Sequence, residues 1–223
     1  MDSIETLKLL ALISGTSVLL PLVVALITFK TLSKSLRIVL LYLIIALIAD
    51  VISYFFAANQ QNNYWVLHIY SPLRVLVLSM FYYVVFKNVK LKKTALACCL
   101  AFLIYSITYS VFSQTDYTVY SDHARAISSL LMIILSILWI IELFSKVEIR
   151  RIETAPAFYI NSAILLYFSA NLFVFIFSEF LLKHQNNNFI YAWSIHSVVY
   201  ILFNILIFVA YLMQWKTRNS LIS

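Results

Sequence analysis

Glycine, cysteine and charge are all scarce in this sequence. The 223 residues include a single glycine, Gly15, and two adjacent cysteines, Cys98 and Cys99, within one apolar run. Two neighbouring cysteines exclude a disulfide framework and a metal cluster, and favour a role as small packing residues. Only 11% of the residues are charged, whereas 63% are hydrophobic. Because soluble domains are about half apolar and about a quarter charged, lipid is the expected solvent of this chain.

The hydrophobic residues form seven runs, each about as long as the roughly 20 residues that a transmembrane helix needs. We therefore predict an all-α, polytopic membrane protein with a single seven-helix transmembrane domain over residues 1–223. The short remaining segments exclude a separate soluble catalytic or DNA-binding domain. The predicted helices cover residues 7–29, 37–57, 64–86, 94–112, 121–144, 157–182 and 189–214.

Lysine and arginine are distributed unevenly over the connecting segments. Twelve of the 16 lie on one side, around residues 30–37, 87–93, 146–151 and 216–218. Only Lys8 and Lys183 lie on the other side. The positive-inside rule then places the N-terminus outside and the C-terminus in the cytoplasm, and we expect the bacterial inner (plasma) membrane. The net charge of +7 is a topology signal and a contact with anionic lipid, which excludes nucleic acid as a partner.

Two pairs of runs resemble each other. Trp65 and His68 follow one polar, uncharged loop, and Trp193 and His196 follow another with the same spacing. This pattern predicts two parallel three-helix halves joined by the fourth helix. The three-plus-one-plus-three plan, the length and the topology resemble the SWEET and PQ-loop superfamily, which implies a small-solute facilitator. The chain lacks the Pro-Gln pair of that superfamily and the prolines that its sugar transporters carry in helices 2 and 5.

A second resemblance covers nearly the whole chain. The segments LHIYSPL at 67–73, NSAILLYFSANL at 161–172 and WSIHS at 193–197 resemble a family of uncharacterised bacterial seven-helix integral membrane proteins of about this size. The resemblance implies a seven-helix bundle and implies no particular activity.

Polar side chains within the runs gather in the predicted outer half. Ionisable groups inside a bilayer are costly, so each is a candidate for function. In the last run Trp193, His196, Tyr200 and Asn204 recur at helical spacing on one face. We expect such stripes to face the interior and to line a polar, aromatic cavity open toward the outside. The candidate ligand-binding residues are Asp50, Tyr54, Trp65, His68, Arg74, His123, Arg125, Asn171, Glu179, Trp193, His196, Tyr200 and Asn204.

Proline and glycine bear on how the helices move. Pro72 cannot donate to the carbonyl of His68, which frees a backbone acceptor beside the predicted cavity. The single glycine and the many bulky aromatic residues predict continuous helices and a comparatively stiff bundle, since broken helices are typical of transporter sites.

These features favour a receptor or sensor component that binds a small polar or amphiphilic ligand and signals to a membrane or cytoplasmic partner. The alternatives are a SWEET-like facilitator and a regulatory interaction protein of the membrane. A second copy of the chain, forming a homo-oligomer, is a further candidate partner. For Asp50 with Arg74 or Arg125, a structural ion pair is an alternative to ligand binding.

We expect no enzyme activity, no cofactor and no metal. A membrane-embedded zinc hydrolase of the ceramidase and adiponectin-receptor type is the enzymatic alternative, since three histidines and Asp50 lie on four runs. However, the chain has no HxxxH or HExxH spacing, and position 200, where that type has its second histidine, is Tyr200.

Overall fold

The computed structural model describes the backbone of residues 3–112, 122–145, 155–184 and 187–219, and the side chains of residues 5–109, 123–145, 155–176 and 191–217. Within these residues all regular structure is helical. The elements are α1 (Ser3–Ser17), α2 (Leu19–Ile27), the 3-10 helix η1 (Phe29–Thr31), α3 (Lys34–Ala58), α4 (Tyr64–Val85), α5 (Val89–Phe112), α6 (Asp122–Ser145), α7 (Pro156–His184) and α8 (Asn187–Asn219).

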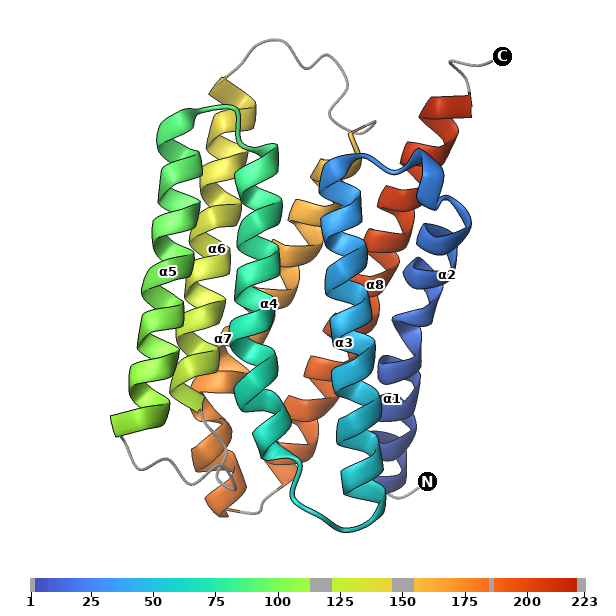
Figure 1. The fold of residues 1–223 in the computed structure, drawn as a ribbon. Helices are drawn as coiled ribbons and strands as arrows, with labels where there is room; N and C mark the ends of the chain where they lie inside the picture. The colour runs from blue at the N-terminus through green and yellow to red at the C-terminus, as the bar shows by residue number, and fades with distance from the viewer. Residues whose placement is uncertain (1–2, 113–121, 146–154, 185–186, 220–223) are drawn as a thin grey trace.

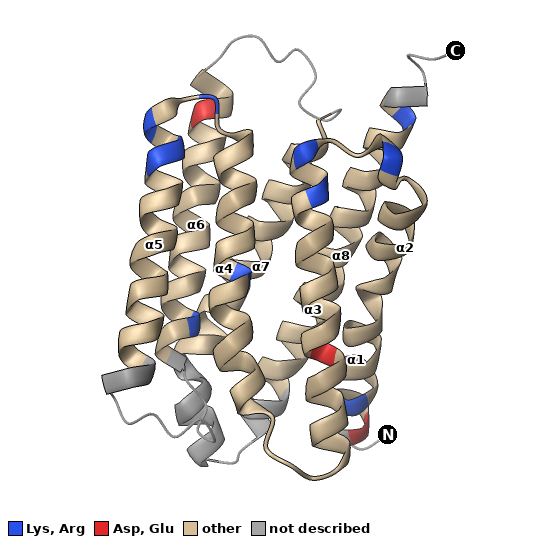
Figure 2. Cartoon of the chain, in the orientation of Figure 1, with Lys and Arg blue, Asp and Glu red and all other residues tan. Residues whose placement is uncertain are grey.

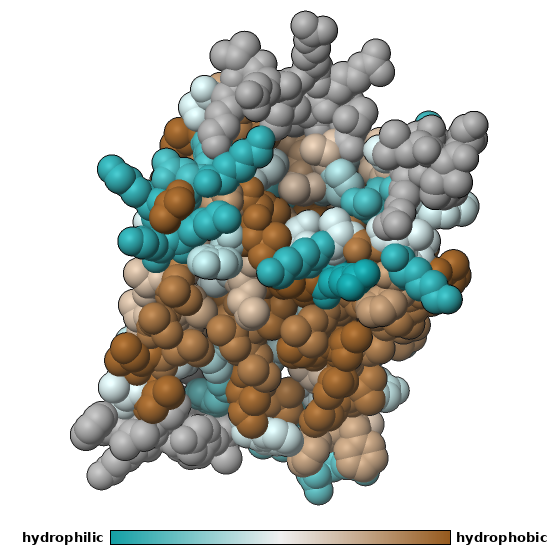
Figure 3. Space-filling model, turned by 45° about the horizontal axis from the view of Figure 1, so that its top comes forward, coloured by the Kyte–Doolittle hydropathy of each residue, from teal (hydrophilic) through white to brown (hydrophobic). Residues whose placement is uncertain are grey.

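Seven spans in the described residues are long and apolar enough to cross a membrane, with α1 and α2 together forming the first. This confirms the predicted all-α fold and is what a multi-pass membrane protein requires. The helices run side by side along one axis, with the chain termini at opposite ends (Figure 1). Hydrophobic side chains cover the middle of the face in Figure 3, below a hydrophilic end.

Helices that follow each other in the chain pack together, and α8 closes the bundle against the first span. α7 packs between α6 and α8, α3 packs against α4, and both α1 and α2 pack against α8. α5 packs against α4 and α6 and is the least buried of the seven spans. The other six spans therefore enclose the middle of the bundle, and α5 lies outside them. The predicted internal repeat stays a prediction.

The first span is bent, so the prediction of continuous helices is wrong there. α1 ends at Ser17 and α2 begins at Leu19. The cause is Pro21, which has no N–H to donate to the carbonyl of Ser17. Val18 between the two helices keeps helical dihedral angles (φ −62°, ψ −24°), so the chain bends without unwinding.

The half of the bundle that contains the α2–α3 connection is tightly packed. Tyr82 of α4 donates a hydrogen bond of 2.9 Å to the side-chain oxygen of Asn161 on α7, and Ser136 of α6 donates to the same oxygen at 2.9 Å. Tyr211 of α8 donates to the carbonyl of Leu36 at 3.0 Å. These polar contacts tie α3, α4, α6, α7 and α8 together. Around them lie fully buried side chains, including Leu43, Leu78, Phe81, Ile164 and Ile207.

Most lysines and arginines of the described residues lie at this same end (Figure 2). There the carboxylate of Glu142, near the end of α6, accepts hydrogen bonds from the backbone N–H groups of Lys87 and Asn88 at 2.6 to 3.1 Å. The side-chain oxygen of Asn88 accepts from the N–H of Lys90 at 2.8 Å. This capping explains why α5 begins at Val89, whereas its apolar run was predicted from residue 94.

Candidate functional site

A cavity of about 430 Å³ lies in the other half of the bundle, next to the α3–α4 loop at residues 59–63. Its walls come from α1, α3, α4, α6, α7 and α8, so only α2 and the peripheral α5 take no part. The volume falls in the range of small-molecule sites. The cavity therefore occupies the half of the bundle that contains the N-terminus, where the polar stripes predicted it.

Six of the candidate residues line this cavity. They come from four helices: one from α3, one from α4, one from α6 and three from α8. These residues are Asp50, Arg74, Arg125, Trp193, His196 and Tyr200. Three of the four residues of the predicted stripe on α8, Trp193, His196 and Tyr200, therefore lie along one wall of the cavity.

Arg74 of α4 is the most deeply buried charge in the cavity wall, with 4% of its surface exposed. One guanidinium nitrogen, Nη2, donates a hydrogen bond of 3.0 Å to the hydroxyl of Ser128 on α6. The guanidinium carbon lies 4.9 Å from the ring centre of Phe168 and 5.6 Å from that of Tyr70. Aromatic faces and a hydroxyl stabilise a cation, but neither neutralises its charge.

Asp50 of α3 provides the carboxylate of the cavity. Its Oδ2 accepts a hydrogen bond of 3.3 Å from the hydroxyl of Tyr200 on α8. Among the described residues, Asp50 forms no ion pair with Arg74 or Arg125. The structural ion pair that the sequence left open is therefore not formed, although both kinds of charge line the same space.

His196 is held in place from behind the cavity. Its Nδ1 lies 2.7 Å from the side-chain oxygen of Asn171 on α7, and the amide of Asn171 donates to the carbonyl of Tyr167 at 2.9 Å. The His196 ring is parallel to that of Tyr200 at 6.5 Å, and Trp193 packs edge-on at 5.2 Å. Asn171 is fully buried, so it positions the histidine and does not line the cavity.

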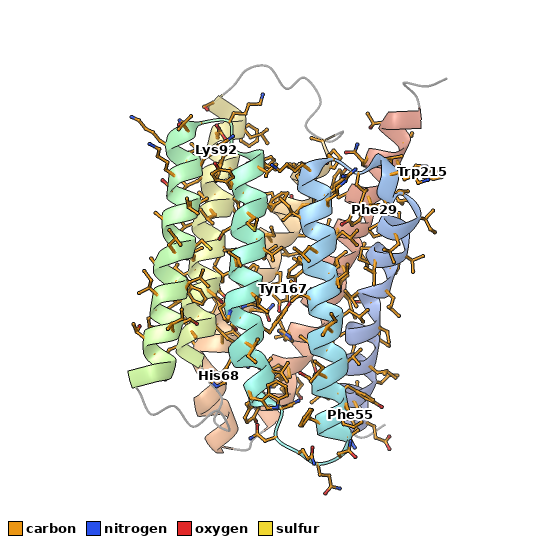
Figure 4. All side chains as sticks on the ribbon, in the orientation of Figure 1. Phe29, Phe55, His68, Lys92, Tyr167 and Trp215 are labelled. Carbon is orange, nitrogen blue, oxygen red and sulfur yellow. The ribbon has the colours of Figure 1, made fainter. Side chains whose placement is uncertain are left out.

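Four candidates point elsewhere. Tyr54 is 70% exposed and does not line the cavity, so the expectation that it faces the interior is wrong. Trp65 packs edge-on against Phe56 at 5.4 Å. His68 is half-buried and His123 is exposed, and neither lines the cavity. Figure 4 shows His68 on α4 nearer the lower end of the bundle, with Tyr167 at mid-height.

The last two candidates are also outside the cavity wall as described. Asn204 is fully buried and donates to the hydroxyl of Ser17 at 2.8 Å, beside the bend in the first span. Glu179 belongs to α7, but its side chain lies outside the described residues.

Several cavity residues were missed, although their spacing was visible in the sequence. Tyr70 and Ser71 precede Arg74 by four and three residues, so all three share one helical face. Tyr167 lies four residues before Asn171 and is aromatic, as much of the lining is. Gly15 of α1 also lines the cavity, and a side chain built there would meet nothing within 4 Å. Tyrosine and serine are uncharged and compatible with membrane helices, so only their helical spacing could have indicated these positions.

Comparison of the chain with protein-family models, with curated proteins and with solved structures finds no match. Among the side chains that the structure describes, no three His, Cys, Asp or Glu groups come close enough together to hold a metal ion. The site must therefore be interpreted from its own geometry: an aromatic cavity with charged groups, closed at one end.

Proposed function

We propose that this protein is a receptor or sensor component of the bacterial inner (plasma) membrane. It binds a small polar or amphiphilic ligand from the outer side and signals to a membrane or cytoplasmic partner. The observation that carries this proposal is the contrast between the two halves of the bundle. One half holds a charged, aromatic cavity, and the other is filled by packed side chains.

The composition of the cavity supports ligand binding. Concave sites with aromatic walls and a few convergent polar groups are where small molecules bind in proteins. Here Trp193, Tyr167 and Tyr200 supply aromatic surface, and Asp50, Arg74 and Arg125 supply the charges. Buried charges are expensive inside a membrane protein and are retained where function needs them.

The packed half of the bundle supports a protein that holds its ligand in the cavity over one that passes the ligand across the membrane. A conducting path would need polar groups along the whole span. Beyond the cavity, Tyr42 and Phe203 pack at 5.7 Å between ring centres, and both are buried. Farther along, the hydrogen bonds of Tyr82 and Ser136 to Asn161 join three helices. A ligand that enters the cavity therefore meets a closed floor.

The distribution of charge supports the orientation. Most basic residues of the described chain gather at the end opposite to the cavity (Figure 2). The positive-inside rule makes that end cytoplasmic. The cavity then opens to the outside, and the basic end is the surface available to a signalling partner or to anionic lipid.

A solute facilitator is the second candidate, and the bend at Val18 favours it. Ser14 and Gly15, directly before the bend, line the cavity. Pro72 lies inside α4, which also lines the cavity. Kinked helices beside a binding site can hinge during transport, so the packed floor would then open periodically.

Paired binding and flux measurements separate the two candidates. Purified protein in nanodiscs is screened by thermal shift against sugars, nucleosides, amino acids, amines and organic acids, and each compound that binds is tested for uptake into proteoliposomes. We expect binding that is lost in Asp50→Ala and kept in Tyr54→Ala, without saturable flux. Saturable flux that Asp50→Ala abolishes would establish the facilitator instead.

A further inference from the structure

The cavity is lined by two cations, Arg74 and Arg125, and by one anion, Asp50. The anion is not neutralised by Arg74. Arg74 and Asp50 both line it, and among the described residues the two form no ion pair. Asp50 lies eight residues before the end of α3, and Arg74 lies ten residues after the start of α4. At 1.5 Å per residue, these positions are about 12 Å and about 15 Å from the nearer ends of their helices, so both charges lie well inside the bundle.

Of the two charged residues, Arg74 is the stronger indication of a bound ligand. It is buried, and within the described residues its Nε has no hydrogen-bond partner. The neighbours of its guanidinium group include the hydroxyls of Ser128 and Tyr167 and the rings of Tyr70 and Phe168, all of them neutral. A guanidinium group offers five donors in a planar fork that fits a carboxylate or a phosphate. An oxyanion in the cavity is therefore the partner that Arg74 lacks.

Asp50 requires a partner of the opposite charge. Its only hydrogen bond in the described structure comes from the Tyr200 hydroxyl, at the long distance of 3.3 Å. The rings of Tyr200 and His196 lie parallel to each other, and Trp193 packs edge-on against His196. An ammonium group can bind a carboxylate directly and gains further from aromatic faces beside it.

We infer that the ligand is a zwitterion, whose carboxylate or phosphate group binds Arg74 and whose ammonium group binds Asp50. The inference rests on the proposed function, because it names the class of ligand that the receptor cavity holds. A simple anion would leave Asp50 unmatched, and a simple amine would leave Arg74 unmatched. Only a molecule with both charges neutralises both ends of the site. Free amino acids have this chemistry, and so does the headgroup of phosphatidylethanolamine.

The test uses the full-length protein in phosphatidylglycerol nanodiscs, which contain no ammonium lipid. Binding is measured by tryptophan fluorescence and thermal shift. The probes are matched triplets: phenylalanine with phenethylamine and 3-phenylpropionate, and leucine with isoamylamine and 4-methylvalerate. We expect at least one amino acid to bind tenfold or more tightly than both its amine and its acid.

Two variants assign the charges. Arg74→Gln should abolish the preference for the amino acid over the amine, and Asp50→Asn should abolish its preference over the acid. Arg74→Lys, which keeps the charge but loses the fork, should weaken binding and keep the preference. Arg37→Gln and Glu5→Gln change exposed charges outside the cavity and should leave binding unaltered.

A lipid arm distinguishes the two sources of a zwitterion. If the headgroup occupies the site, phosphatidylethanolamine nanodiscs should raise the melting temperature of the wild-type protein but not of Arg74→Gln, and should weaken amino-acid binding. If the ligand is a free amino acid, the lipid exchange should change neither. Both results support the inference.

Other outcomes overturn it. Equal binding of the amino acid and the acid would show that Asp50 recognises no ammonium group. The absence of a response to every probe in both lipids would refute a zwitterionic ligand. Binding of a sugar or a nucleoside instead would refute the zwitterionic ligand but would still be consistent with the proposed receptor function. Saturable flux of an amino acid would refute the proposed receptor function but would still support a zwitterionic ligand.

Discussion

The hydrogen bonds around Asn161 should be a measurable part of what closes the bundle beyond the cavity. Its side-chain oxygen accepts from Tyr82 of α4 and from Ser136 of α6, each at 2.9 Å, and all three residues are buried. Asn161→Ala removes that acceptor. Ser136 can still donate to the backbone carbonyl of residue 161, 3.2 Å away, whereas the Tyr82 hydroxyl is left unpaired.

The expected magnitude follows from this difference. A buried hydroxyl without a partner costs about 1–3 kcal/mol, so Asn161→Ala should destabilise the bundle by about 2 kcal/mol. Tyr82→Phe leaves Asn161 bonded to Ser136 and should cost only about 0.6 kcal/mol, the average for interhelical hydrogen bonds in membranes. In the Tyr82→Phe background, Asn161→Ala leaves no orphaned hydroxyl and should cost about 1 kcal/mol less.

Reversible unfolding in mixed micelles, followed by circular dichroism, supplies the four free energies of this double-mutant cycle. Leu166→Ala, at an exposed position of the same helix, is the control and should show no coupling to Tyr82→Phe. A coupling between Asn161 and Tyr82 within about 0.3 kcal/mol of zero, the ordinary scatter of independent sites, would refute the reasoning.

Three further predictions concern the ends and the walls of the bundle. Glu142→Ala should destabilise the protein by about 2 kcal/mol in the same unfolding assay, because the backbone N–H groups of Lys87 and Asn88 lose a charged acceptor. Gly15→Ala should leave stability within about 0.5 kcal/mol of wild type, while Gly15→Leu should extend into the cavity and abolish probe binding in the thermal-shift screen. In a cysteine-free background, Gln61→Cys should react with a membrane-impermeant maleimide on intact cells, and Lys90→Cys only after lysis. The opposite labelling pattern would reverse the orientation.

The fold could be predicted from the sequence because membrane solvation imposes a simple rule. Each span needs a long apolar run, and the seven runs are separated by polar segments, so their number was correct. The bend at Val18 was missed because the scarcity of glycine received more weight than Pro21, which has no N–H for the hydrogen bond to the carbonyl of Ser17. The peripheral position of α5 could not be predicted, since apolar runs look alike whether they face lipid or protein.

The site was predicted in part for a related reason. Helical spacing identified His196 and Tyr200, because residues three and four apart share a face whatever lies opposite. Spacing does not say which face points inward. Tyr54 was therefore placed inside together with Asp50, although the helix turns it outward. Which charges pair across helices is also set by packing, so the separation of Asp50 and Arg74 required the structure.

Labelling of Gly15→Cys in a cysteine-free background tests the central claim most directly, because this position lines the cavity with open space around it. Inside-out and right-side-out vesicles are treated with a membrane-impermeant thiol reagent. A receptor with a closed floor should be labelled only from the side of the α3–α4 loop, and a bound probe should slow the reaction. Labelling from both sides would contradict the account, since it would show that the cavity opens alternately to each face of the membrane.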